Sequence, residues 1–226
     1  MSLRIRDTPS PNHDDRPAGT PVDMLVLHYT GMRTGAAAID RLRDPAARVS
    51  SHYVVEEDGT IFGLVPEARR AWHAGLSHWR GAAGLNGRSI GIEIVNPGHD
   101  RGYRPFPALQ MAAVCDLCLE ILGRHRIPAI NVVAHSDIAP DRKQDPGEFF
   151  DWEGLAANGV GLWPGEGAAP AGDAAALLAA IGYRMDLPLD VLLVAFQRHW
   201  RPERVDGVAD AETLARLAGV AALIGA

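Results

Sequence analysis

Two histidines and one aspartate stand where patterned segments of the chain end. His28 lies near the end of the apolar run 24–29, His135 closes the run 131–135, and Asp145 follows in a polar loop. A hydrolytic zinc site needs three nitrogen or oxygen ligands from the protein and one open position for water. Two imidazoles and a carboxylate supply such a set. On spacing alone the choice stays open, because nine histidines permit other triplets and a lone histidine is more often structural.

The segments that would position these side chains alternate between strand and helix patterns. Short apolar runs predict buried strands, and an Asp-Gly turn between two of them predicts a hairpin. In the longer of two predicted helices, Leu109, Ala113, Leu117 and Ile121 form an apolar stripe. We therefore expect an α/β fold with a mixed central β-sheet flanked by helices. The expected strands are 24–29, 52–56, 60–65, 89–95 and 131–135, and the expected helices are 35–43 and 107–125.

Both ends of the chain differ from this body. Residues 1–23 are rich in Pro, Asp and Arg without apolar periodicity, which predicts an extended arm lying on the body. A stretch of Gly, Pro and Ala predicts a linker at 166–172. Beyond it, amphipathic patterns predict a small three-helix domain at 173–226, after a catalytic domain at 1–165. Its expected helices are 173–182, 188–199 and 211–217.

Composition excludes several classes of partner. A net charge of -6 and a pI near 5.8 argue against nucleic acids and anionic membrane surfaces, which require clustered positive charge. No apolar run approaches the roughly 20 residues of a membrane span, and the first residues lack the apolar segment of a signal peptide. We therefore expect a cytoplasmic location. Cys115 and Cys118, the two cysteines, lie in a helical pattern and are expected to be buried, inert thiols.

Six segments together resemble the type 2 N-acetylmuramoyl-L-alanine amidases, the AmpD-like zinc amidases. This family includes muropeptide-recycling enzymes, phage amidases and animal peptidoglycan-recognition proteins. The resemblance covers most of residues 22–165, and six motifs in the family's order are far more specific than any one of them. The segments are 28–30 (His-Tyr-Thr), 51–53 (Ser-His-Tyr), 58–59 (Asp-Gly), 70–75 (Arg-Ala-Trp-His-Ala-Gly), 89–93 (Ser-Ile-Gly-Ile-Glu) and 135–147.

The resemblance implies a role for each matching residue. It implies that His28, His135 and Asp145 bind Zn2+, that Glu93 acts as general base or acid, and that Lys143 stabilises developing negative charge. The chemistry agrees, because a carboxylate near an activated water can move its proton to the leaving amine. The alternatives are an ion pair of Glu93 with an arginine such as Arg88 and a solvated Lys143.

The long connection before the strand at 89–95 offers candidates for binding the substrate. Aromatic faces suit sugar rings, and an arginine can hold stem-peptide carboxylates through paired hydrogen bonds. His52 is expected to pack on the sheet rather than to support the metal. Histidines 13, 78, 99, 125 and 199 are expected at the surface or at helix ends. The substrate-binding candidates are Trp72, His73, Trp79, Asn86 and Arg88.

The sequence thus predicts zinc-dependent hydrolysis of the amide between N-acetylmuramic or anhydro-muramic acid and L-alanine. The predicted partners are peptidoglycan fragments or muropeptides, acted on by a monomer in cell-wall recycling. The C-terminal part, through its Phe-Gln-Arg stretch at 196–198, is similar to small three-helix peptidoglycan-binding domains. Two alternatives remain. One is a non-catalytic peptidoglycan-recognition protein, and the other is an exported, periplasmic wall-remodelling amidase, for which a wall-binding module makes more sense.

Overall fold

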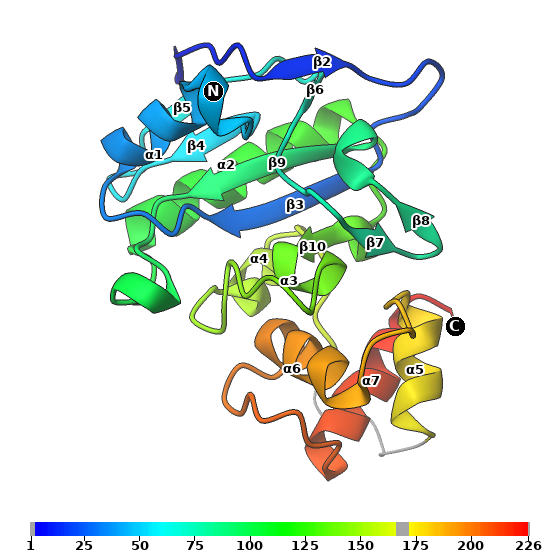
Figure 1. Ribbon diagram of the computed structural model, residues 1–226. Coiled ribbons are helices and arrows are strands. Elements are labelled where there is room, and N and C mark those ends of the chain that lie inside the picture. Colours follow the sequence, from blue (N-terminus) through cyan, green and yellow to red (C-terminus); the bar gives the residue numbers. More distant parts are fainter. Residues whose placement is uncertain (1–2, 166–171, 226) are drawn as a thin grey trace.

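The computed structural model describes residues 3–165 and 172–225, which form an α/β body and a C-terminal group of three helices (Figure 1). The six-stranded central sheet has the order β1-β5-β4-β9-β3-β10, and two short strand pairs flank it. The expected α/β fold with a mixed sheet is confirmed.

The strands are β1 (Ile5–Asp7), β2 (His13–Asp15), β3 (Met24–Tyr29), β4 (Tyr53–Val55), β5 (Ile61–Gly63), β6 (Arg69–Ala71), β7 (His78–Trp79), β8 (Ala82–Ala83), β9 (Ser89–Ile94) and β10 (Val132–Ala134). The helices are α1 (Gly35–Arg43), α2 (Ala108–Arg124), α3 (His135–Ile138), α4 (Trp152–Ala157), α5 (Ala174–Ile181), α6 (Leu189–Trp200) and α7 (Ala211–Leu223), with short 3-10 turns at Pro45–Ala47, Leu85–Gly87, His99–Arg101 and Ala129–Asn131.

The four central strands run parallel, so their carboxyl ends meet at one edge of the sheet. β3 pairs in parallel with both β9 and β10, and β9 pairs in parallel with β4. The predicted hairpin joins β4 to β5, whose pairing is antiparallel, and Gly59 in its turn has a φ of +84° that favours glycine. In open α/β sheets, ligands bind at the carboxyl ends of such strands.

Side-chain alternation divides β9 between the two faces of the sheet. Ile90, Ile92 and Ile94 belong to the core that includes α2, so the intervening residues face the other side. The buried residues of α2 are Gln110, Val114, Leu117, Cys118 and Ile121. The predicted stripe was therefore wrong in part, since Leu109 is 70% exposed. Gln110 is buried in its place because its amide donates to the carbonyls of Val55 and Val95.

Two groups of helices cover the opposite face. Ile39 and Leu42 of α1 pack with Val54 and Val95. The C-terminal helices pack on β3 and β10 in one continuous core, which contains Met24, Val26 and Val133 from the body and Leu178, Leu193, Phe196 and Leu217 from the helices. The C-terminal helices therefore complete the covering of the sheet.

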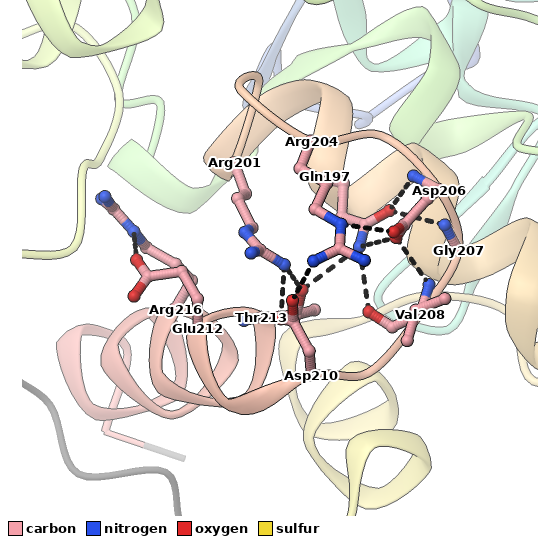
Figure 2. A network of polar contacts seen from close by, with 10 residues as sticks. All are labelled: Gln197, Arg201, Arg204, Asp206, Gly207, Val208, Asp210, Glu212, Thr213 and Arg216. Atoms are coloured by element: carbon pink, nitrogen blue, oxygen red, sulfur yellow. Dashed lines mark hydrogen bonds and ion pairs between the residues drawn. The ribbon is translucent and has the colours of Figure 1, made fainter.

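The two ends of the chain are both fixed to the body. In the N-terminal arm, β1 pairs with β5 and β2 pairs with β6. The three predicted C-terminal helices are present, whereas most of the predicted linker, 166–171, lies outside the described residues. Figure 2 shows how the loop before α7 is held: the Gln197 side chain accepts from the backbone N–H of Asp206 and Gly207 and donates to the Val208 carbonyl. Among the described helices, none has the length and apolarity of a membrane span.

Candidate active site

Three side chains converge at the carboxyl end of the sheet. His28 is near the end of β3, His135 begins α3 directly after β10, and Asp145 lies in the following loop; all three are buried. His28 Nδ1 lies 2.9 Å from His135 Nδ1, and each nitrogen lies 3.0 Å from Asp145 Oδ2. Among the described residues, this is the one group whose ligand atoms lie close enough to share a metal ion. The triplet predicted from the sequence is thus assembled.

The proton positions around His28 can be worked out from its neighbours. The Ser89 hydroxyl donates its hydrogen to the Leu85 carbonyl at 2.8 Å, so it accepts from His73 Nε2 at 3.1 Å. His73 Nδ1 is then left as an acceptor, and it takes the hydrogen bond from His28 Nε2 at 3.0 Å. His28 therefore carries its proton on Nε2 and presents the Nδ1 lone pair to the site.

The second imidazole is oriented in the same way. His135 Nε2 donates to the Ala74 carbonyl at 3.3 Å, which leaves its Nδ1 free to bind a cation. The segment that accepts from both ligands is itself fixed, because Asn86 Oδ1 accepts from the backbone N–H groups of His73 and Ala74 at 3.1 and 2.7 Å. Adjacent residues of one segment thus orient both ligand rings.

Alternation along β9 accounts for the pattern Ser-Ile-Gly-Ile-Glu. Ser89, Gly91 and Glu93 share the face that carries the site. A Cβ atom on Gly91 would stand 2.4 Å from the His73 ring, so only glycine leaves room for that ring. Glu93 is the register partner of His28 on the neighbouring strand. One strand face therefore supports the histidine relay and places a carboxyl group beside the ligands.

Burial keeps His28 and His73 neutral. Desolvation, with a smaller effect of His135, lowers the pKa of His28 to about 4. Burial likewise places the pKa of His73 well below its ordinary value. Although burial alone would raise the pKa of Asp145, the two histidines hold it below the ordinary value. At neutral pH the site therefore presents the neutral His28 imidazole and the Asp145 carboxylate.

The donor set fits a zinc ion. With the ring protons on Nε2, as assigned above, three lone-pair atoms face one point, and a bound cation stabilises that arrangement. Ligands about 2.0 to 2.1 Å from a tetrahedral ion stand roughly 3.3 Å apart, close to the separations found here. Neutral histidine nitrogen and carboxylate oxygen are common zinc ligands.

Glu93 has the properties of an acid-base group. Its Oε2 atom is buried without a hydrogen-bond partner. Burial first, and the nearby Asp145 second, raise its pKa well above the ordinary value, against an opposing effect of Lys143. The alternative pairing with Arg88 does not occur, because Arg88 donates to Asp23 through Nε at 2.6 Å.

An open cavity of about 380 Å³ exposes the site. Glu93, His135 and Asp145 line it, and so do Lys143 and Trp72. Tyr29 and the α1 residues Ala38 and Arg41 form other parts of its wall. Two of the three predicted metal ligands, His135 and Asp145, therefore border one space with the predicted acid-base and cationic residues, and this space is large enough for a small ligand.

The predicted substrate-binding residues divide into three groups. Trp72 lines the cavity, as expected of a substrate contact. His73 lines the same cavity, and with Asn86 it also lines an adjoining hollow, but the polar atoms of both residues orient the segment 73–74 as described. Trp79 is 1% exposed and packs edge-on against Tyr183 at 5.2 Å between ring centroids, and Arg88 pairs with Asp23 away from the cavity. Trp79 therefore packs in the core and Arg88 forms an ion pair, in place of the substrate contacts that the sequence predicted for them.

The remaining predictions on histidines and cysteines have mixed outcomes. His52 is fully buried and bonds to the backbone of Gly91 and Arg69, in keeping with packing. His199 lies in the last turn of α6, one of the two places expected for it, but it is 2% exposed and donates to buried Asp137. Cys118 is buried, whereas Cys115 is partly exposed. Sequence reasoning missed Asp137 and His199, since their partners lie in different elements.

Comparison with known proteins places this geometry in a family. A family model described as N-acetylmuramoyl-L-alanine amidase matches residues 18–148. The chain is 40% identical to the N-acetylmuramoyl-L-alanine amidase AmiD of Escherichia coli, with 86% of this chain and 80% of AmiD covered. It is 36% identical to the 1,6-anhydro-N-acetylmuramyl-L-alanine amidase AmpD of Enterobacter cloacae, with 65% of this chain and 86% of AmpD covered.

Comparison with solved structures also finds N-acetylmuramoyl-L-alanine amidases. Escherichia coli AmiD, solved with anhydro-N-acetylmuramic acid-L-Ala-D-γ-Glu-L-Lys, has a TM-score of 0.82 at 38% identity, covering 92% of each chain. AmpDh3 of Pseudomonas aeruginosa, solved with an anhydromuramic pentapeptide, has a TM-score of 0.80 at 36% identity, covering 90% of this chain and 93% of AmpDh3. Both similarities extend well beyond residues 18–148, the segment that the family model matches.

Proposed function

Since this chain belongs to the N-acetylmuramoyl-L-alanine amidase family and is a hydrolase of that class, we propose that it cleaves anhydro-muropeptides with a zinc ion held by His28, His135 and Asp145. The observation that carries the proposal is the convergence of three lone-pair atoms within 3.0 Å of one another, next to the unpaired Oε2 of Glu93. Two structural relatives were solved with anhydromuramic peptides, which supports this class of substrate.

Zinc, when bound, polarises the scissile carbonyl and makes water a nucleophile near neutral pH. The protein supplies the remaining groups. His73 and the Ala74 carbonyl keep both imidazoles in the tautomer that binds a cation, so the site needs little rearrangement on loading. Trp72 offers an aromatic surface at the cavity wall for the apolar face of a sugar ring.

Proton transfer falls to Glu93. Its raised pKa brings the carboxyl group nearer to the pH at which it can both take a proton from water and release it to the leaving alanine amine. Lys143 borders the same cavity, where an ammonium group stabilises the oxyanion of the tetrahedral intermediate. Glu93 thus moves the proton and Lys143 stabilises the negative charge that develops on oxygen, and neither residue is a metal ligand.

The test is hydrolysis of anhydro-muramyl-tripeptide and of intact peptidoglycan sacculi, each with and without a zinc chelator, following release of the peptide amine. We expect chelator-sensitive cleavage of the soluble fragment that zinc restores. Cleavage of sacculi alone would support the wall-remodelling alternative. If neither substrate is cleaved, the non-catalytic recognition protein becomes the better interpretation.

A cytoplasmic, monomeric enzyme remains the expectation, with a periplasmic location as its alternative. One observation supports this location: both cysteines are free, as in a reducing compartment. Fractionation of the native host tests it, since recovery in the periplasm contradicts the prediction. The sequence also predicts that the C-terminal helices bind glycan, and a pull-down with sacculi tests this prediction.

A further inference from the structure

We propose that the C-terminal helical unit, residues 172–225, is a positioning element of the catalytic centre: its Tyr183 and His199 hold Asp137, and Asp137 holds the start of α3, which carries His135. This inference deepens the proposed function, because it rests on the metal site formed by His135 and its partners. It assigns the helices a role beyond any contact with the cell wall.

Asp137 is the point at which the two parts of the chain meet. Asp137 is 1% exposed, and its carboxylate accepts three hydrogen bonds. Tyr183 donates through its hydroxyl at 2.7 Å, His199 through Nδ1 at 2.7 Å, and the Ala134 backbone through its N–H at 2.8 Å. A buried carboxylate is tolerated only with such partners. Two of the three come from the C-terminal helical unit.

The bond to Ala134 fixes the turn between β10 and α3. His135 is the first residue of α3, directly after Ala134, so the position of this turn sets the position of the ligand ring. The same short helix also holds the loop that carries the third ligand, because the Ser136 N–H donates to the Asp145 carbonyl at 3.0 Å. A shift of Asp137 would therefore move two of the three ligands.

The two donors from the C-terminal helical unit are themselves rigidly held. The His199 ring is stacked between Trp152 and Trp200, with centroid separations of 3.8 and 3.6 Å. Tyr183 packs edge-on against Trp79 of the body. Close-packed aromatic rings leave little freedom for either donor. A module that serves only to tether the enzyme would need no such buried polar connection to the ligand helix.

A second connection runs along the surface. Arg198 of α6 donates to the Gln144 side chain at 3.2 Å, and its Nε lies 3.8 Å from Glu148. Both partners flank Asp145 in the ligand loop. The C-terminal helical unit therefore contacts the ligand region twice, once in the core through Asp137 and once through Gln144 and Glu148 in the loop that carries Asp145.

The experiment compares zinc affinity in full-length Tyr183→Phe and Gln197→Ala by competition with a chromophoric chelator. Tyr183→Phe removes only the hydroxyl that donates to Asp137. Gln197→Ala is the matched control, since it removes a buried hydrogen-bonding centre of the same helical unit (Figure 2) that has no contact with Asp137. Turnover is measured in parallel with limiting and with excess zinc.

We expect Tyr183→Phe to weaken zinc binding roughly tenfold, the lower end of what loss of a supporting partner costs a metal site. Its turnover should fall at limiting zinc and recover with excess zinc. Gln197→Ala should lower the melting temperature while its zinc affinity stays unchanged. In an Asp137→Asn background, Tyr183→Phe should have little further effect, because the two residues act through one contact.

Two results would overturn the inference. One is an unchanged zinc affinity in Tyr183→Phe, and the other is an equal loss of affinity in Gln197→Ala, which would trace the effect to general stability. A wild-type chain that binds no zinc at all would instead overturn the proposed metal site, so the two failures are distinguishable.

Discussion

Replacing His73 with alanine tests whether a residue that does not bind the metal sets the affinity of the site. In the wild-type chain, His73 Nδ1 accepts the hydrogen bond of His28 Nε2. Without it, metal-free His28 can move its proton to Nδ1 and satisfy it with Asp145, whereas the metal-bound form must keep the proton on a buried Nε2 with no acceptor. The substitution therefore penalises the bound state selectively.

The magnitude follows from that orphaned donor. A buried donor without a partner costs about 1 to 3 kcal/mol, and a value of about 2 kcal/mol corresponds to a roughly 30-fold weaker zinc complex. This agrees with the 10- to 100-fold range for lost supporting partners of metal ligands. His73→Asn should recover part of the affinity, because its side-chain oxygen can accept near the position of Nδ1.

The assay is zinc competition against a chelator of known affinity, with His52→Ala as the matched control. His52 is buried like His73 and its ring lies 5.7 Å away, but its hydrogen bonds are to the backbone of Gly91 and Arg69. Equal loss of zinc in both variants would refute the relay, since it would show that any buried histidine in this region has the same effect.

Four further outcomes are expected. Glu93→Ala should retain zinc and lose turnover by roughly a hundred- to ten-thousandfold, the usual contribution of a general acid-base group. Gly91→Ala should weaken zinc, because its Cβ would stand 2.4 Å from the His73 ring; metal analysis and activity check both. Arg88→Ala should leave KM unchanged in steady-state assays, because its ion pair lies away from the cavity. His52→Gln should flatten the pH dependence of stability: burial lowers the pKa of His52 from 6.5 to about 3, so the unfolded chain binds more protons at this residue between these values. The wild type should therefore lose about 2 kcal/mol more than the variant between pH 7 and pH 5. Urea unfolding of the metal-free proteins at both pH values measures that difference.

Each of these outcomes has a clear contradiction. A Glu93→Ala variant with unchanged rate would mean that another group moves the proton. Full zinc affinity in Gly91→Ala would show that the His73 ring can shift without consequence. A raised KM in Arg88→Ala would restore the substrate-binding prediction for that residue. Parallel pH curves for His52→Gln and wild type would show that His52 is not buried as a neutral ring.

The strands and the convergence of the three candidate metal ligands could be predicted because their signals are local. The apolar runs that end in His28 and His135 mark strands, and parallel strands bring such ends to one edge of the sheet. Motif order then selected Asp145 from the many carboxylates. The buried face of α2 was mispredicted because Gln110 is a polar residue whose hydrogen bonds to two strand carbonyls leave no mark in the sequence.

Asp137 and His199 show a second limit of sequence reasoning. Each is an ordinary polar residue in its own segment, and their contact joins positions 62 residues apart. Trp79 was assigned to a sugar for the same reason: an aromatic ring in a long loop suits a groove, but the helices that cover it come from the other end of the chain. Long-range packing determines the surroundings of Asp137, His199 and Trp79. Sequence periodicity could not predict these contacts, because it reports only the neighbours of a residue along its own helix or strand.

The pattern Ser-Ile-Gly-Ile-Glu at 89–93 illustrates how far a motif can be explained once the structure is known. Its isoleucines pack toward α2, and its other residues take three different roles on the opposite face. Ser89 fixes the proton of His73, Gly91 leaves space for that ring, and Glu93 supplies the carboxyl group in the cavity. Because a shift of register by one residue would exchange the two faces, the strand cannot change its pairing without losing the core and the site together. The motif therefore specifies the fold and the chemistry through the same alternation.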